Sequence, residues 1–176
     1  MEQRHPRRLA LIVTIILFSL IGLLVREFPI LSNTMGAGSL VIASMLTGLL
    51  LSSFAVWHFR ERFKPWDRHF PDVALVLVPC IVFAPLFGSL LNRGLGKTTS
   101  QTFEFVSELP FYASGYGMLK GEKAKASGYH LQARQNGKQY RFKYKSQAYY
   151  PNTKPGEKIM LPVREGFFGA NVMLLK

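Results

Sequence analysis

A row of cations lies on one face of a predicted strand in the second half of the chain. Residues 139–145 alternate aromatic and basic side chains, which places the two kinds on opposite faces. Lys and Arg side chains gathered on one face attract anionic groups. The candidate anion- or partner-binding residues are Arg134, Lys138, Arg141, Lys143 and Lys145, joined by the lysines of residues 120–125. The alternative is a solvated outer face whose lysines prevent edge-to-edge strand pairing.

The segment Gly94–Thr99 resembles a phosphate-binding loop, because two glycines precede a Lys-Thr pair. A true phosphate loop needs a glycine five positions before Gly96, and Leu91 stands there. An apolar helix, not a strand, is predicted before it. We therefore interpret the segment as a linker over residues 92–100.

Other side chains with catalytic potential are scattered. The four histidines lie far apart in the sequence, and one of them, His130, falls in the second half. The single cysteine, Cys80, sits within an apolar stretch and can form no disulfide within the chain. No spacing indicates a metal site, a carboxylate pair or a nucleophile with its base. We predict no enzyme activity, no metal and no cofactor.

The elements that must position the basic face begin with three uncharged apolar stretches. Each is long enough to span a bilayer as a helix, and the three are Leu9–Val25, Met35–Trp57 and Val73–Leu91. They contain no ionisable side chain other than Cys80, which argues against transport. We predict a three-span transmembrane region over residues 1–91.

Basic residues in the short loops predict the orientation. The N-terminal tail and the loop of residues 58–72 hold seven Lys and Arg, whereas the loop of residues 26–34 holds only Arg26. This distribution predicts a bacterial plasma (inner) membrane protein with a cytoplasmic N-terminus and a periplasmic or extracellular C-terminal domain. Residues 92–176 contribute +9 of the net charge of +12, but long translocated segments follow the rule weakly.

The second stretch carries small residues at helical spacing. Such stripes allow two helix backbones to approach closely in lipid. The candidate helix-packing residues form two stripes, one of Ser39, Ala43 and Thr47 and the other of Ser44, Gly48 and Ser52. Ordinary membrane-helix composition explains them equally well.

Alternating patterns after residue 100 predict five or six short strands. They are separated by turn signals, of which Asn136-Gly137 is the strongest for a hairpin. Predicted strands cover residues 102–106, 129–134, 139–145, 158–163 and 170–175, while residues 109–127 are expected to form an irregular strand and a long loop. We predict a small antiparallel β-barrel or sandwich domain over residues 101–176.

The C-terminal turns also carry a family resemblance. Residues 155–159 read Pro-Gly-Glu-Lys-Ile, Val163 follows, and residues 166–169 read Gly-Phe-Phe-Gly. This pattern resembles the end of a group of bacterial membrane proteins that have a few spans and a C-terminal β domain. It is distantly similar to the oligonucleotide/oligosaccharide-fold tail of the NfeD family. The Asp and Trp typical of the first pattern are Glu157 and Asn171 here. The resemblance implies a small membrane-anchored barrel and transfers no catalytic residue.

Together these features predict a non-catalytic membrane-anchored module with a basic, tyrosine-rich β domain. Its expected partner is an envelope protein, with the chain acting as an accessory subunit or as a toxin-immunity protein. The alternative is a lipid- or glycan-binding sensor or lipid-handling protein of the plasma membrane. With the domain outside the cell, nucleic acid is not expected as a partner, whereas a cytosolic domain would admit single strands.

Overall fold

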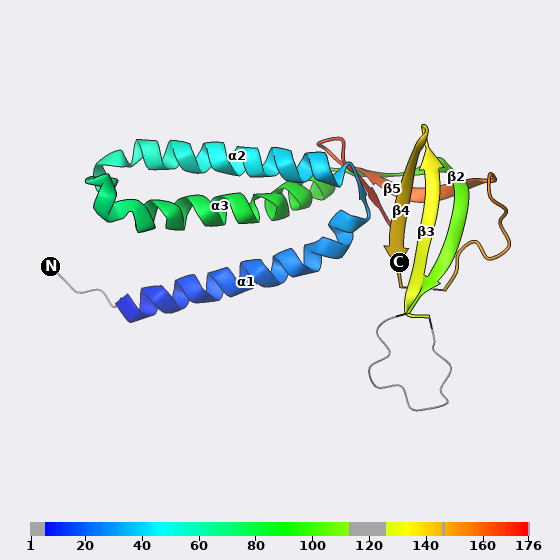
Figure 1. Ribbon diagram of the computed structural model, residues 1–176, viewed down its shortest axis with the longest axis horizontal. Coiled ribbons are helices and arrows are strands. Elements are labelled where there is room, and N and C mark those ends of the chain that lie inside the picture. The colour runs from blue at the N-terminus through cyan, green and yellow to red at the C-terminus, as the bar shows by residue number, and fades with distance from the viewer. Residues whose placement is uncertain (1–5, 113–125, 146, 176) are drawn as a thin grey trace, which may run out of the picture. The chain divides into compact units, whose positions relative to one another are not determined.

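The computed structural model describes residues 6–112, 126–145 and 147–175 (Figure 1). Its internal contacts divide the chain into two compact units. The helical unit comprises residues 1–28 and 38–91, and the β domain comprises residues 29–37 and 92–176. A short piece of chain between the first two long helices therefore belongs to the β domain.

Three long helices are present, as predicted. They are α1 Pro6–Ser32, α2 Ala37–His58 and α3 Trp66–Gly94, with a short 3-10 helix, η1 Arg60–Phe63, before α3. Each is long and apolar enough to cross a membrane, over Leu11–Ser32, Ala37–His58 and His69–Gly94. Large apolar side chains such as Phe18, Leu50 and Leu75 are exposed on them. Helices that expose such side chains in bulk are typical of proteins whose solvent is lipid.

Helix α1 is longer than the sequence predicted. The expected first stretch ended at Val25 with a loop over residues 26–34, whereas α1 continues to Ser32 with Pro29 inside it. Glu27 is consequently a helical residue, 3% exposed, and its carboxylate accepts a hydrogen bond of 2.8 Å from the hydroxyl of Ser89 on α3. A hydrogen bond of this kind reduces the cost of burying the Glu27 carboxylate. The sequence prediction ended the span before Glu27 because it counted only uninterrupted apolar residues.

Helices α2 and α3 run side by side and pack through small residues (Figure 1). A Cβ added at Gly48 would lie 2.6 Å from the backbone oxygen of Cys80 and 2.7 Å from Cβ of Ala84. A Cβ at Gly88 of α3 would likewise collide with Ser44. The stripe of Ser44, Gly48 and Ser52 therefore faces α3. The other predicted stripe is exposed and consists of Ser39, Ala43 and Thr47.

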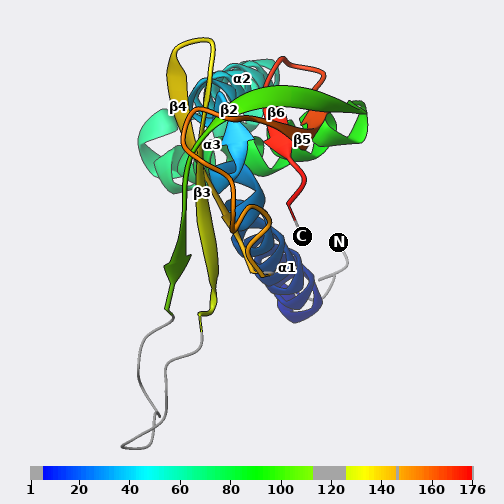
Figure 2. The same ribbon diagram turned by 90° about the vertical axis from the view of Figure 1, so that its right-hand side faces the viewer.

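The β domain is one antiparallel sheet of six strands among the described residues (Figure 2). The strands are β1 Thr34–Met35, β2 Lys97–Phe111, β3 Gly128–Gln135, β4 Lys138–Tyr144, β5 Lys158–Glu165 and β6 Asn171–Met173. Their order in the sheet is β1-β6-β5-β2-β3-β4. The sheet curls into a nearly closed barrel, which agrees with the predicted barrel or sandwich.

The long strand β2 joins the two halves of the barrel. It pairs with β5 from Lys97 to Glu104 and with β3 from Glu104 to Phe111, with an irregularity between Phe105 and Ser107. Such bulges bend a strand and increase its twist. The linker expected at residues 92–100 is reduced to two residues, because α3 ends at Gly94 and β2 begins at Lys97.

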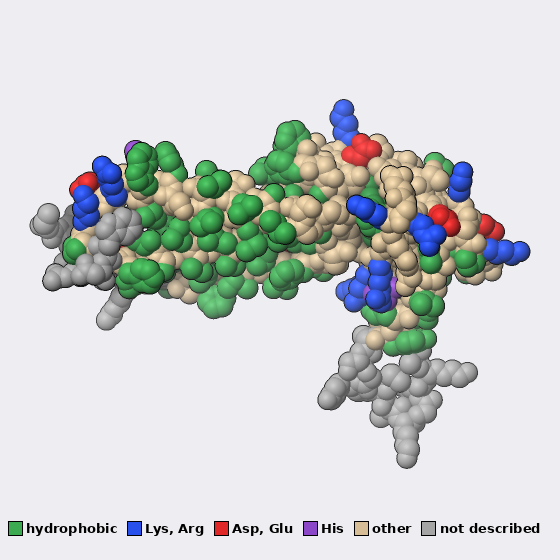
Figure 3. Space-filling view, turned by 45° about the horizontal axis from the view of Figure 1, so that its top comes forward, with side chains coloured by type: hydrophobic (Ala, Val, Ile, Leu, Met, Phe, Trp, Pro, Cys, Tyr) green, Lys and Arg blue, Asp and Glu red, His purple; other side chains and the backbone are tan. Residues whose placement is uncertain are grey.

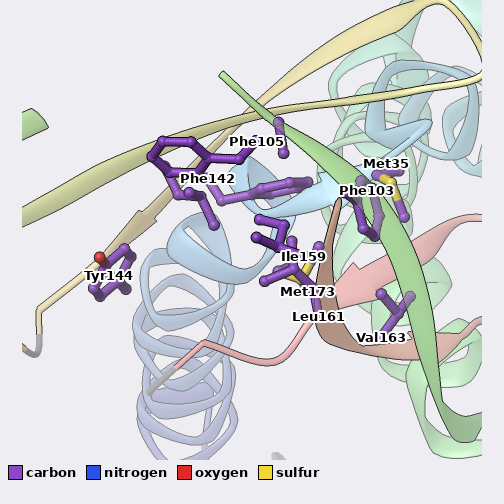
Figure 4. Packing of buried hydrophobic residues seen from close by; sticks show 11 residues of the cluster. Met35, Phe103, Phe105, Phe142, Tyr144, Ile159, Leu161, Val163 and Met173 are labelled. Atoms are coloured by element: carbon purple, nitrogen blue, oxygen red, sulfur yellow. The ribbon is translucent and has the colours of Figure 1, made fainter. Parts of the chain in front are cut away.

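The barrel interior is filled by the apolar members of the alternating strands (Figure 4). On β4, Phe142 is 2% exposed while Arg141 and Lys143 are exposed, as strand alternation requires. The Phe142 ring meets Phe103 of β2 edge to face at 6.2 Å between centroids. The buried cluster consists of Met35, Phe103, Phe105, Leu131, Ala133, Phe142, Tyr144, Ile159, Leu161, Val163 and Met173.

A single asparagine links the two edge strands of the barrel. The Asn33 side-chain amide donates to the carbonyl oxygen of Lys143 on β4 at 2.6 Å, and its oxygen accepts from the Lys143 N–H at 2.8 Å. The Asn33 carbonyl accepts from the N–H of Met173 on β6 at 3.0 Å. Asn33 thus takes the place of a strand residue across the gap between β4 and the β1–β6 edge.

Candidate anion-binding face

The outward face of β2, β3 and β4 carries three of the predicted basic residues, Arg134, Arg141 and Lys143, one in each of three cross-strand rows. Lys145 directly follows the end of β4 and is exposed. The register aligns Leu109 with His130 and Lys143, Ser107 with Gln132 and Arg141, and Glu104 with Arg134 and Gln139. Figure 3 shows Lys and Arg side chains beside a histidine on the surface of the β domain. We call Arg134, Arg141, Lys143 and Lys145, together with His130, the basic face.

His130 is a member of the basic face for which the sequence indicated no neighbouring functional residue. Its ring contacts Phe111 at 5.0 Å between centroids, and Lys143 places its Nζ 4.2 Å from the centroid of the same Phe111 ring. Burial lowers the pKa of His130, and the positive charges of Arg141 and Lys143 lower it further. The Nδ1 atom is buried and has no hydrogen-bond partner in the described part of the chain. The strict alternation of residues 128–135 is the signal that could have placed His130 beside Lys143.

Arg134 and Lys138, two further predicted cations, lie farther along the β3–β4 hairpin than His130 and Lys143. Arg134 on β3 has its Nη1 3.8 Å from Oε1 of Glu104, an exposed pair of little energetic weight. Lys138 opens β4 after the Asn136-Gly137 turn, where both residues adopt positive φ. Alternation gives Lys138 the inward parity of Tyr140, so its exposed side chain emerges at the hairpin end and outside the basic face. The lysines of residues 120–125 lie outside the described residues.

The described tyrosines of the β domain differ in exposure. Of the six described tyrosines, Tyr112 and Tyr149 are exposed, whereas Tyr144 is 3% exposed. Tyr129, Tyr140 and Tyr150 are intermediate in exposure, so the tyrosine-rich surface stays a prediction. The alternation of β4 turns Tyr144 toward the core.

Glu108 binds the segment after β4 to the barrel. Its carboxylate accepts hydrogen bonds from the Tyr144 hydroxyl, from the Tyr149 N–H at 3.0 Å and from the Tyr150 N–H at 3.1 Å. Burial and the hydrogen bond to Glu108 raise the pKa of Tyr144. This acid has a structural role. The register aligns Glu108 with the buried Leu131, so it lies on the face of β2 opposite to the basic face.

The described residues contain no group of three or more His, Cys, Asp or Glu that could hold a metal ion. The Gly94–Thr99 segment ends a helix and begins strand β2, so no helix N-terminus follows its glycines to bind a phosphate.

The helical unit has a cleft of its own where α2 meets η1 and α3. It combines apolar walls from Val56 and Val73 with the indole of Trp57 and two cations, Arg60 and Lys64. Lys64 and Arg60 both approach Glu61, with nitrogen–oxygen distances of 2.9 and 3.7 Å. Apolar walls and cations that line one cleft are features that can accommodate an anionic lipid.

The fold and the basic face together define a protein with three membrane-type helices and a small antiparallel barrel. Comparison with known protein families gives no match to the chain, and comparisons with curated proteins and with solved structures give none either. The relation to NfeD-like proteins stays a hypothesis that rests on the turn pattern of residues 155–169.

Proposed function

We propose that this chain is a non-catalytic membrane-anchored interaction protein of the bacterial plasma membrane. Its three helices anchor the β domain, and the basic face binds an acidic protein of the cell envelope. The observation that carries the proposal is the alignment of Arg141, Lys143 and His130 on one outward face, with Glu104 as the acid that the register places in those rows. The role is that of an accessory subunit in an envelope assembly or of a toxin-immunity protein.

The distribution of basic residues supports an outward-facing β domain. Arg60, Arg62, Lys64 and Arg68 all lie between α2 and the apolar part of α3, and cytoplasmic loops are enriched in such residues. Residues 29–37, between α1 and α2, belong to the same compact unit as residues 92–176. Three membrane crossings place these two segments on the same side, so the β-domain contacts and the span count agree.

Charge reversal on the basic face is expected to abolish most partner binding. A photo-reactive amino acid at Gln139, which lies beside Arg134, should form a protein adduct in cells. The double variant Arg141→Glu plus Lys143→Glu should reduce the adduct yield roughly tenfold, because attraction to an acidic surface becomes repulsion. The pKa of His130 should rise in the same variant, since two neighbouring positive charges are removed.

The matched control is Lys97→Glu plus Lys154→Glu, which changes the net charge equally at exposed positions outside the cross-strand rows of the basic face. This control should leave the adduct yield unchanged. Equal loss in both double variants would indicate a general charge effect and would contradict a specific basic face. An adduct that survives reversal of Arg141 and Lys143 would contradict the proposal outright.

A second candidate function is favoured by the cleft of the helical unit, namely anionic-lipid binding. Native mass spectrometry of the detergent-solubilised chain should then show retained phosphatidylglycerol. The variant Arg60→Gln plus Lys64→Gln should lose it, whereas Arg62→Gln should keep it, because Arg62 lies over the Phe59 ring and does not line the cleft. Equal retention in all three proteins would contradict a lipid site in this cleft.

A further inference from the structure

Two adjacent phenylalanines project from the turn between β5 and β6. Phe167 is 65% exposed and Phe168 is 55% exposed, and their rings meet edge to face at 5.2 Å between centroids. Gly169 closes the turn with a hydrogen bond of 2.9 Å from its N–H to the Gly166 carbonyl, at a φ of +78° that favours glycine. Transfer of two such exposed apolar side chains from water to an apolar environment is favourable.

The turn is fastened to the last turn of helix α3 through Asn92. The Phe167 N–H donates to the Asn92 carbonyl at 3.0 Å, and the Phe168 N–H donates to the Asn92 side-chain oxygen at 2.9 Å. The Asn92 amide in turn donates to the Ala170 carbonyl at 2.7 Å. Asn92 is fully buried, and a Cβ at Gly166 would collide with its side chain. These contacts fix the position of the two phenylalanines relative to the last turn of α3.

The end of α3 also indicates which environment the turn meets. Asn92 lies in the last turn of the candidate span His69–Gly94, where a membrane-crossing helix reaches the boundary between hydrocarbon and headgroups. Leu95, just beyond the helix, is a second large apolar residue that is 62% exposed near the end of the span. Phenylalanine, like tryptophan and leucine, is among the apolar side chains by which interfacial segments bury into the boundary between headgroups and acyl chains. A lipid environment follows from continuity with the span, without any additional protein.

We propose that the Phe167–Phe168 turn inserts into the interface of the bilayer and serves as an additional membrane anchor of the β domain. The inference rests on the three helices crossing the membrane. It does not rest on the partner of the basic face. Inserted aromatic side chains, together with the Asn92 contacts, would hold the turn at a defined depth in the interface.

Tryptophan fluorescence in lipid vesicles tests the proposal. In a full chain carrying Trp57→Phe and Trp66→Phe, the substitution Phe167→Trp introduces one indole at the turn. In phosphatidylcholine–phosphatidylglycerol vesicles, lipids brominated near the headgroup should quench its fluorescence by about half, and aqueous acrylamide should quench it weakly. The comparison position is Met160→Trp on β5, which is 66% exposed and roughly 16 Å along the strand from Glu165. Its indole should show the reverse pattern.

Strong acrylamide quenching and no bromolipid quenching of the Phe167→Trp indole would overturn the proposal. An indole protected from both quenchers would also overturn it, because protein would then cover the turn. Leu50→Trp, in the middle of α2 and 70% exposed, separates failure of the anchor from failure of membrane insertion. If brominated lipid quenches the Leu50→Trp indole alone, the helices are inserted and only the turn is not. If it quenches neither, the membrane placement itself is wrong.

Discussion

Replacing Phe142 by alanine is expected to lower the unfolding free energy of the β domain by about 3–5 kcal/mol. The side chain is 2% exposed and packs edge to face on Phe103 in the centre of the barrel. Truncation removes buried apolar area and leaves a cavity that a curved sheet cannot close. A loss of that size approaches the whole stability of a small domain. The midpoint of thermal unfolding, followed in detergent by near-ultraviolet circular dichroism, should fall by more than roughly 10 °C.

The neighbouring residue Arg141 provides the control for this prediction. It lies one position away on the same strand, its side chain is exposed, and Arg141→Ala should change the unfolding free energy by less than about 0.5 kcal/mol. Similar shifts for Phe142→Ala and Arg141→Ala would mean that β4 does not alternate between core and solvent. That result would also remove the geometric basis of the basic face.

The second large effect is expected at Asn33, whose side chain bridges the barrel edges. Asn33→Ala removes two hydrogen bonds to the Lys143 backbone, at a cost of about 2 kcal/mol if each contributes about 1 kcal/mol. The specific readout is hydrogen exchange of the Lys143 amide, which Asn33 Oδ1 protects. Exchange at Lys143 should accelerate in the variant far more than exchange at Phe142.

Asn33→Asp is a graded control for the same site. Aspartate keeps an oxygen that accepts from the Lys143 N–H but cannot donate to the Lys143 carbonyl when ionised. The Lys143 amide should therefore stay protected while part of the stability is lost. Ser32→Ala should have little effect, because the Ser32 hydroxyl donates only to the Pro29 carbonyl of its own helix. Unchanged exchange at Lys143 in Asn33→Ala would contradict the closure of the barrel by Asn33.

Local patterns predicted the elements well where a single periodicity governs the fold. The three apolar stretches became helices, and the alternation of residues 139–145 correctly placed Phe142 inside and Arg141 outside. The Asn136-Gly137 turn joins β3 and β4, as its preference for positive φ indicates. Half-buried strands reveal their two faces in sequence because the chemistry of the faces differs.

Long-range contacts explain where the structure differs from the sequence predictions. Asn33 and Lys143 are 110 positions apart, so nothing near residue 33 indicates that the end of α1 and the two-residue strand β1 belong to the barrel. Lys97–Ser100 appeared to be a linker because its side chains are polar, yet it pairs with Pro162–Glu165 of β5. The sequence prediction placed Glu27 outside the first span because a charged residue in a span needs a partner. That partner is Ser89, which is 62 positions away on another helix.

The most direct test of the proposed membrane-anchored, outward-facing β domain is the location of the C-terminus. Fusions after Lys176 to alkaline phosphatase, active only in the periplasm, and to a fluorescent protein that matures only in the cytosol report the side of the membrane. An outward-facing β domain predicts phosphatase activity after Lys176 and cytosolic fluorescence from a reporter inserted after Glu61. Cytosolic fluorescence after Lys176 would contradict it, and would place the basic face where nucleic acid or the inner lipid leaflet becomes its partner.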